Sequence, residues 1–593
     1  MNEIMNVSMI YATPLFQNLA GFCFIGLYLV RRYINLSLFF YFMEKFYRKL
    51  IEEILARGLT SVEEVLKLRR EICRELKPNV FPSIIQILLH AKEEEVGRLK
   101  FLITKPTRTL SGVTPVAIMT SPCACPHGKC IMCPGGVDSH FGDVPQSYTG
   151  KEPATMRGIR NNYDPYLQVF NRLEQYNLLN QSSDKVELII MGGTFPAREK
   201  EYQEEFVMYA FKAMNDFSEM FFDENGLKFD KFKKFFELPG EVSDERMKRI
   251  HEKILKLKGE SNLIKEHERN ETTKVRCVAL CIETRPDFGK LEEGNYMLKL
   301  GCTRVELGVQ SVDDNVLKKI ERGHTVEDTT EAIRVLRDLG FKISIHYMPG
   351  LPGVKDELED MKTLFSDERF KPDMIKLYPC IITKGTKLYE MWERGEFEPI
   401  TTGQAAELIV HFKKYVPEYC RIQRIQRDIS GKVIEAGVDM TNLRQHIHDG
   451  WNVKCRCIRC REVGRAKKFG EVKIKVIEYG ASKGKEFFIS AEDEHDNLYG
   501  FCRLRFPSEE LREELKNCGI VRELHVYSTA INVGEKSDNS FQHKGLGKKL
   551  MAKAEELCKG KRIVVISGIG VRGYYEKLGY VKEGVYMVKS LSL

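Results

Sequence analysis

The sequence predicts an α/β protein whose main domain is a full or partial parallel barrel, followed by a smaller α+β domain. Between about residues 101 and 390, short apolar strands alternate with helical stretches, which is typical of a parallel sheet with crossover helices. From about residue 466 onward, strands follow one another directly before a glycine turn and a helix. At 593 residues the chain is also too long for one core, so several domains are expected.

The barrel segment contains apolar stretches that we predict to be strands, separated by helical runs such as "TVEDTTEAIRVLRDLG". The predicted strands are "VTPVAIMTS", "VELIIMGG", "VRCVALCIET", "TRVELGVQS", "FKISIHYMPG" and "DMIKLYP". In such a barrel the loops at the C-terminal strand ends carry the chemistry. Residues 198–270 follow the second strand, are charged and mostly helical, and are expected to form a solvated cap.

Three further segments flank the barrel. Residues 43–100 are helical, periodic and basic, and residues 391–465 are an Arg- and Cys-rich linking module. Residues 466–593 form the α+β domain. Its predicted strands are "VKIKVIEYG", "KEFFISAED", "LYGFCRLRF", "RELHVYS" and "RIVVIS".

The first 42 residues differ from the rest. Residues 11–30, "YATPLFQNLAGFCFIGLYLV", carry no charge and are long enough to span a bilayer, but the leading basic region of a signal peptide is missing. A conventional soluble pattern begins at Met43. We therefore expect Met43 to be the start and residues 1–42 to be translated upstream sequence, with a membrane segment as the alternative.

Charge and cysteine content bound the function. The formal charge of +8 permits a polyanionic partner without proving one. The 17 cysteines are clustered and odd in number, which favours metal sites in a reducing compartment over a disulfide framework. We expect a cytoplasmic protein with no membrane partner.

The stretch "CACPHGKCIMCPGG" contains the first metal site that we predict. Cys125, Cys130 and Cys133 have the spacing C-x4-C-x2-C. Three thiolates could hold a [4Fe–4S] cluster and leave one iron without a protein ligand. Zinc would need a fourth ligand, which Cys123 or His127 could supply. The spacing alone leaves both metals open.

The position of these cysteines favours the cluster. They follow the first predicted strand, and the second strand ends in "MGGT", with Gly192 and Gly193. This combination resembles the radical S-adenosylmethionine enzymes. The resemblance implies that the open iron binds the amino and carboxylate groups of S-adenosylmethionine, that the glycine pair contacts the amino group, and that cleavage yields a 5′-deoxyadenosyl radical. The usual spacing there is C-x3-C-x2-C, so the extra residue points to a subfamily.

Other polar residues lie at later strand ends. They are Glu283 in "IETRPD", Gln310 in "LGVQS" and His346 in "IHYMPGLPG". Each could line the cofactor pocket or be a satisfied structural group.

The stretch "QHKGLGKKLM", residues 542–551, is the second motif. Its glycines leave backbone N–H groups free at a helix N-terminus, where they can bind a pyrophosphate. Together with "ELHVYS" before it and "YYEKLGY" after it, the turn resembles the GCN5-related N-acetyltransferases. The resemblance implies acetyl-CoA with these contacts: Glu523, Leu524, His525 and Val526 at the pantetheine arm, Leu546, Gly547 and Lys548 at the pyrophosphate, and Tyr575, with Tyr574, at the thioester. Core packing is the alternative for both tyrosines.

A radical barrel joined to an acetyltransferase domain resembles the Elongator catalytic-subunit family in its archaeal single-chain form. The resemblance covers residues 43–593 and rests on stretches such as "QSYTGKEPATMRGIRNNYDPY", "DKVELIIMGGTFPA" and "FQHKGLGKKLM". It implies that a carboxymethyl group derived from acetyl-CoA is added to C5 of the wobble uridine U34 in the tRNA anticodon. C5 is a poor target for ordinary acetyl transfer, so the radical is expected to act on the acetyl methyl group. The resemblance alone places Lys185 near acetyl-CoA.

The linking module contains "KCRCIRC", in which Cys455, Cys457 and Cys460 have the spacing C-x-C-x2-C. Thiolates this close predict structural zinc. The family resemblance favours Cys380 as the fourth ligand, with Cys420 second. Free buried thiols are the alternative.

Basic runs predict the tRNA surface, because phosphate contacts supply most of the affinity. Arg421, Arg424 and Arg427 are three apart and are predicted to share one helical face. Two further patches are expected, one with Arg465, Lys467 and Lys468, the other with Arg48, Lys49, Lys67, Arg69 and Arg70. U34 must leave the anticodon stack to reach a buried radical, so base flipping is expected.

Two alternatives remain at this point. A protein lysine acetyltransferase that uses the barrel as a scaffold would need no S-adenosylmethionine. An RNA-binding scaffold with a degenerate barrel conflicts with the intact cysteine motif. The sequence leaves open the electron donor, the tRNAs used and whether the chain forms a homodimer.

Overall fold

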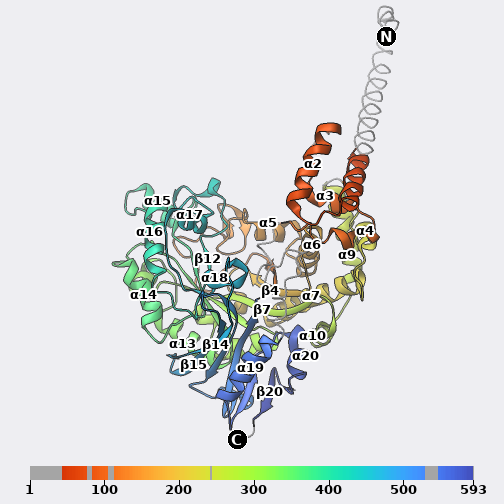
Figure 1. The fold of residues 1–593 in the computed structure, drawn as a ribbon. Helices are drawn as coiled ribbons and strands as arrows, with labels where there is room; N and C mark the ends of the chain where they lie inside the picture. The colour runs from red at the N-terminus through yellow and green to blue at the C-terminus, as the bar shows by residue number, and fades with distance from the viewer. Residues whose placement is uncertain (1–42, 77–82, 105–111, 241–242, 528–544, 592–593) are drawn as a thin grey trace, which may run out of the picture.

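The computed structural model describes residues 43–76, 83–104, 112–240, 243–527 and 545–591 (Figure 1). The predicted leader, residues 1–42, and the first residues of the glycine turn, 542–544, lie outside the described residues. Among the described residues, none of the helices has the length and apolar character needed to cross a membrane.

The main domain is a seven-stranded parallel sheet that curls without closing, so the predicted partial barrel is confirmed. The strand order is β1-β4-β7-β8-β9-β10-β12, with β1 and β12 at the two edges. The strands are β1 (Thr114–Met119), β4 (Lys185–Met191), β7 (Arg276–Thr284), β8 (Arg304–Gln310), β9 (Lys342–Tyr347), β10 (Met374–Leu377) and β12 (Arg421–Ile425).

Capped amphipathic helices cover this sheet. In α6 (Pro165–Leu178), Asp164 accepts a hydrogen bond from the N–H of Leu167 and proline occupies the first turn, where its missing N–H costs nothing. In α13 (Val326–Asp338), Thr325 and Asp328 form a capping box. Each helix buries an apolar face on the strands, which fixes the strand ends in register.

The insertion after β4 is helical, as predicted, but it is not a solvated cap. It consists of α7 (Lys200–Phe221), α8 (Phe229–Phe235), α9 (Asp244–Lys258) and α10 (Leu263–Thr272). Phe211 and Phe217 of α7 are fully buried and belong to the main core. The charged residues of the sequence obscured this apolar face, which packs as an inner layer.

The segment "RIQRI" forms the edge strand β12, so the prediction of a helix there is wrong. The pairing of β10 with β12 shifts register between Ile375 and Lys376, because Gln423 is an extra residue. Such a bulge lets a pattern of period three occupy a strand. The barrel sheet therefore extends beyond residue 390.

The C-terminal domain contains a second seven-stranded sheet, in the order β14-β15-β16-β17-β18-β20-β19. Its strands are β14 (Lys473–Ala481), β15 (Gly484–Glu492), β16 (Leu498–Phe506), β17 (Cys518–Val526), β18 (Arg562–Val565), β19 (Val581–Glu583) and β20 (Tyr586–Ser590). The pairs are antiparallel except β17 with β18. The helix α19 (Leu546–Leu557) packs on β15, β16 and β17.

This domain packs against the N-terminal ends of the barrel strands. A Cβ on Gly568 would lie 2.1 Å from the carbonyl oxygen of Val278 in β7, so only glycine fits this contact. Buried ion pairs also cross the boundary: Arg522 Nη1 lies 2.7 Å from Asp373 Oδ2, at the start of β10. Because both charges are fully buried, the boundary fixes the two domains against each other.

Candidate active site

A single cavity of about 1480 Å³ runs through the half-barrel and into the C-terminal domain. Cys125, Cys130 and Cys133 line it at the C-terminal ends of the strands. Gly547 and Tyr575 line it at the opposite end. The interior of a closed parallel barrel is normally filled by side chains. Here the open barrel leaves space between the two sites that the sequence predicted separately.

Donors to sulfur surround the three cysteines. Gln146 Nε2 lies 2.9 Å from Cys133 Sγ, and Arg322 Nη1 lies 3.6 Å from Cys130 Sγ. Burial raises the pKa of the Cys130 thiol, and the Arg322 charge opposes this rise. Donors of this kind stabilise thiolates that ligate a metal.

The distances between these thiols distinguish an iron–sulfur cluster from a single zinc ion. Around one tetrahedral zinc, sulfur atoms lie about 3.8 Å apart, given a Zn–S distance of about 2.3 Å. Among the described residues, Cys125, Cys130 and Cys133 do not form a group with all ligand atoms within 4.8 Å, whereas Cys455, Cys457 and Cys460 do. The wider arrangement fits an iron–sulfur cubane. His127 Nε2 is 3.2 Å from Cys130 Sγ, as a hydrogen-bond partner.

The turn after β4 fits the predicted cofactor cradle. Gly192 has φ +123°, and a Cβ there would lie 2.3 Å from Thr120 Oγ1, so both conformation and space require glycine. Gly193 follows with φ +99° and lines the cavity. Gln310, at the end of β8, lines the same cavity.

Two arginines that sequence reasoning missed lie beside this turn and the cluster loop. Arg285 is 3% exposed, and its Nη1 has no hydrogen-bond partner although Asp287 holds Nε and Nη2. Arg322 donates to the carbonyl of Gly308 at 2.7 Å, and its Nε has no partner. Orphaned guanidinium donors in a cavity fit an anionic ligand such as the carboxylate of S-adenosylmethionine.

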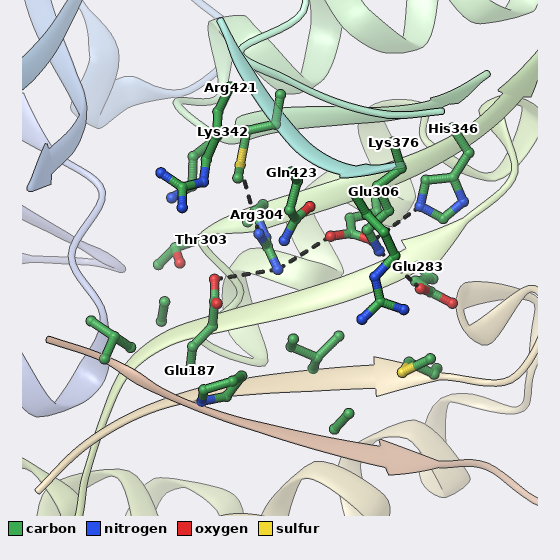
Figure 2. Close-up of a pocket in the computed structure, with 18 of the residues that line it drawn as sticks. Glu187, Glu283, Thr303, Arg304, Glu306, Lys342, His346, Lys376, Arg421 and Gln423 are labelled. Carbon is green, nitrogen blue, oxygen red and sulfur yellow. Dashed lines mark hydrogen bonds and ion pairs between the residues drawn. The ribbon is translucent and has the colours of Figure 1, made fainter. Parts of the chain in front are cut away.

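A ladder of charged side chains crosses the middle of the barrel (Figure 2). Glu306 is fully buried; it contacts Lys376 Nζ and lies 3.0 Å from His346 Nε2. Although burial opposes it, the Lys376 and Arg304 charges hold the pKa of Glu306 well below its usual range. Burial and Lys376 lower the pKa of His346, so its ring is neutral at pH 7.

Glu283 accepts a hydrogen bond from the Tyr148 hydroxyl at 3.0 Å. Glu283 and His346 therefore line the pocket.

These acids do not form a metal site. Ligand atoms of Glu283, Glu306 and His346 lie within 4.8 Å of one another. The ammonium of Lys376, however, contacts Glu306 and lies 3.5 Å from Glu283, in the place that a cation would take.

An unpaired strand edge faces the cavity in the C-terminal domain. β17 pairs with β18 only over Cys518–Val521, so no described strand pairs with that edge at residues 522–526. Glu523, Leu524, His525 and Val526 all line the cavity there. A free edge can accept the amide groups of an extended arm as an added strand would.

The glycine turn and the tyrosines complete this end. Gly545 caps α19 with φ +94°, and Leu546, Gly547 and Lys548 form the first turn. A Cβ on Gly547 would lie 2.7 Å from the Tyr574 hydroxyl. Burial raises the pKa of Tyr575, which is 6% exposed, so its phenol is protonated. Lys185, the first residue of β4, is exposed and lines the same cavity at the end that faces this domain.

Comparisons with known proteins agree with both halves of this site. The family model described as the radical SAM superfamily matches residues 120–365, its C-terminal domain matches residues 372–450, and the acetyltransferase (GNAT) family matches residues 460–580. The chain is 45% identical, over 92% of its length and 100% of the relative's, to a Methanocaldococcus infernus protein named tRNA uridine(34) acetyltransferase. It is 39% identical to Elongator complex protein 3 of Homo sapiens, with 83% and 86% of the two chains covered.

The chain belongs to the Elongator complex protein 3 family. A solved structure of archaeal Methanocaldococcus infernus Elp3 with an N-terminal deletion matches with a TM-score of 0.65 at 40% identity, over 82% of this chain and all of that one. The radical-enzyme barrel and the acetyltransferase domain predicted from the sequence are confirmed.

The second cysteine group of this Elongator-family chain contains three of the four thiols that were assigned to zinc from the sequence. Cys455, Cys457 and Cys460 have their sulfur atoms within 4.8 Å of one another, which suits one tetrahedral ion. Cys380 is not in this group. It is buried in an apolar cluster with Ile131 and Leu388, so the structure does not bring this predicted fourth ligand together with the other three thiols. The carbonyl of Cys420 accepts a hydrogen bond from Ile458, next to the group, but its thiol is outside the 4.8 Å set.

Arginines from β12, from the loop after it and from the cysteine-rich module line the cavity. This arginine rim consists of Arg421, Arg424, Arg427, Arg444, Arg459 and Arg465. The first three are on β12 and the loop after it, not on a helix. Burial and the charges of Arg444 and Arg421 lower the pKa of Arg459 to about 10. Crowded positive charge of this kind favours a polyanionic ligand.

The N-terminal patch is more neutral than the sequence indicated. Arg48 lies 2.7 Å from Glu95, Lys49 is 2.5 Å from Glu75, and Lys67 is 3.3 Å from Glu63. Arg70 donates to the carbonyl of Leu66. Lys467 and Lys468, after the rim, are exposed. The rim also contains ion pairs, of Arg421 and Arg465 with Glu462 and of Arg424 with Asp428, but its arginines line the cavity, which makes the rim the stronger candidate for RNA contact.

Proposed function

We propose that this chain modifies the wobble uridine of tRNA, adding an acetyl-CoA-derived carboxymethyl group at C5. The single observation that carries the proposal is the shared cavity, which reaches the cluster cysteines, the free edge of β17 and the arginine rim. Relatives named tRNA uridine(34) acetyltransferase support the same substrate.

Each part of the cavity has a role in this proposal. Cys125, Cys130 and Cys133 hold a [4Fe–4S] cluster, while Gly192, Gly193 and Gln310 contact S-adenosylmethionine. The bound cluster and cofactor supply one-electron chemistry, which can reach a C–H bond that no side-chain base deprotonates. Arg285 and Arg322 offer unsatisfied donors to the carboxylate of the cofactor.

The acetyltransferase domain presents the second substrate. The edge at Glu523–Val526 binds the pantetheine arm, and the N–H groups of Leu546, Gly547 and Lys548 bind the pyrophosphate. Tyr575, with Tyr574, keeps a protonated phenol near the thioester. Lys185, the first residue of β4, lines the cavity and is proposed to lie near acetyl-CoA.

The arginine rim binds the anticodon stem-loop, and the uridine enters the cavity after leaving its stack. Structural zinc is held by Cys455, Cys457 and Cys460 beside β12. The bound ion would keep the arginines of the rim in place. An electron donor must reduce the cluster. All described cysteines are free of disulfides, which supports a reducing compartment, the cytoplasm.

Anaerobic assay of the reconstituted full-length chain tests the proposal. We expect carboxymethylated uridine and 5′-deoxyadenosine, both dependent on acetyl-CoA and tRNA. Acetylated protein formed without S-adenosylmethionine would instead identify a lysine acetyltransferase.

A further inference from the structure

An ion bridge crosses the cavity between its two ends. Arg304 of β8 lies 3.2 Å from Glu187 of β4 and 3.2 Å from Glu306, through the same Nη2 atom (Figure 2). Since β7 separates β4 from β8 in the sheet, the Glu187–Arg304 contact spans the concave face of the barrel. Glu187, Arg304 and Glu306 line the cavity together with β17 and the cluster cysteines, so a ligand in this cavity can reach the bridge.

The guanidinium of Arg304 is poorly satisfied. It is 1% exposed, its Nη1 lies 3.6 Å from the sulfur of Met374, and the buried thiol of Cys281 is a second hydrogen-bond partner of the side chain. Its Nε and Nη2 have no hydrogen-bond partner among the described residues, although Nη2 lies 3.2 Å from each of the two carboxylates. A buried donor without a good acceptor costs free energy. A ligand oxygen that aligns with Nη2 would recover it.

The two acids of the bridge differ in burial and in the number of cationic partners. Glu306 is fully buried and also contacts Lys376 and His346. Glu187 is 21% exposed, and Arg304 is its one cationic partner among the described residues. Glu187 is therefore the acid that can move away at low cost.

We propose that the thioester carbonyl oxygen of acetyl-CoA displaces Glu187 and accepts a hydrogen bond from Arg304. Arg304 is then the catalytic residue that places the acetyl methyl group on the cluster side of the bridge. This inference rests on the proposed function and adds a residue that recognises the acyl group. Glu187 acts as a gate that holds the guanidinium until a carbonyl arrives.

Binding of two matched ligands to the full-length chain with its cluster tests this role. Acetyl-CoA is compared with S-ethyl-CoA, a thioether with the same two-carbon chain that lacks the carbonyl oxygen. Calorimetry should give wild type a preference of about fivefold for acetyl-CoA, as one hydrogen bond predicts. Arg304→Gln should lose this preference. Glu187→Gln should increase it by about threefold, because a neutral amide competes less for the guanidinium.

Glu266→Gln is the matched control. Glu266 is also a buried acid paired with an arginine, Arg269, but it lies outside the cavity. It should keep the wild-type preference. Arg304→Lys provides a second test if Arg304→Gln does not fold, since it keeps the charge but loses the planar fork and should lower the preference. An unchanged preference in both Glu187→Gln and the Arg304 variant would overturn the inference. Failure of wild type to bind either ligand would overturn the proposed function instead.

Discussion

Lys342 of the barrel donates a hydrogen bond to Glu523 of the acetyltransferase domain at 2.7 Å. The two side chains are 13% and 11% exposed, and Arg503 also donates to Glu523, at 2.9 Å. Lys342 begins β9, the strand that carries His346, and Glu523 lies on the unpaired part of β17. One buried ion pair thus ties the wall of the radical site to the strand proposed to bind the pantetheine arm.

Replacing Glu523 by Gln should make stability less dependent on acid pH. Although burial favours the neutral acid, Lys342 and Arg503 lower the pKa of Glu523 from 4.5 to about 2. A lowered pKa contributes stability above the unfolded pKa, near 4.5, and this is lost as pH falls towards 2. The shift corresponds to about 3 kcal/mol. Melting curves from pH 7 to pH 3 should therefore show the gap between wild type and Glu523→Gln narrowing below pH 4.5.

Glu583→Gln is the control for this experiment, because Glu583 pairs with Arg562 at the surface and is 46% exposed. Its effect should stay below about 1 kcal/mol at every pH. A gap for Glu523→Gln that does not change with pH would contradict the role of its charge.

Replacing Lys376 by Met should destabilise the barrel. The substitution leaves Glu306 and Glu283 without their shared ammonium, and a buried charge that loses its partner costs about 3–5 kcal/mol. Adding Glu306→Gln removes one of the stranded charges, so the double variant should unfold at a higher temperature than Lys376→Met alone. Equal melting temperatures would show that Lys376 does not neutralise Glu306.

The sequence predicted the parts of the fold that have continuous apolar patterns. Six strands of the barrel follow apolar runs, and the cluster cysteines have a diagnostic spacing. β12 was missed because its bulge gives a strand the period of a helix. The burial of α7 could not be predicted from the sequence either, because this helix carries charged residues on one face and buries phenylalanines on the other.

The interior of the cavity was the least predictable part. Arg304 and Lys376 occupy positions in strands where the sequence offers no sign that a charge faces inward, and Arg322 lies in an ordinary polar loop. Their roles depend on partners from other strands, which only the fold brings together. Local spacing likewise defined three zinc thiols but could not locate a distant fourth, and the structure places Cys380 outside the group that the three form.

Gly192→Ala should abolish binding of S-adenosylmethionine. The positive φ and the 2.3 Å approach to Thr120 Oγ1 mean that a methyl group must displace the turn. Equilibrium binding to the reconstituted chain measures this. Gly403→Ala is the control, because a Cβ there meets no atom within 4 Å in helix α16 (Thr402–Phe412); it should bind normally and be slightly more stable. Normal binding by Gly192→Ala would exclude the turn from the cofactor site.

Cys457→Ser should remove zinc from the purified chain. Its thiol lies among those of Cys455 and Cys460, and two thiolates hold a tetrahedral ion much less tightly than three. Elemental analysis should show zinc lost and iron retained. Cys380→Ser should keep both metals, since this thiol lies elsewhere. Unchanged zinc in Cys457→Ser would refute this site.

Reversing two charges of the arginine rim should weaken tRNA binding. Arg424 is 44% exposed beside Asp428, and Arg427 lies over the rings of Tyr148 and Tyr378, which also line the cavity. Each phosphate that the protein no longer neutralises should reduce the slope of log affinity against log salt by about 1. Gel shifts of Arg424→Glu/Arg427→Glu at several salt concentrations should therefore show lower affinity and a shallower slope. Lys485→Glu/Lys516→Glu makes the same charge change at two exposed lysines of the C-terminal domain, one in β15 and one in the turn before β17, and should bind almost as wild type. If both pairs weaken binding equally, overall charge rather than the rim attracts the RNA, and the uridine must enter the cavity by another route.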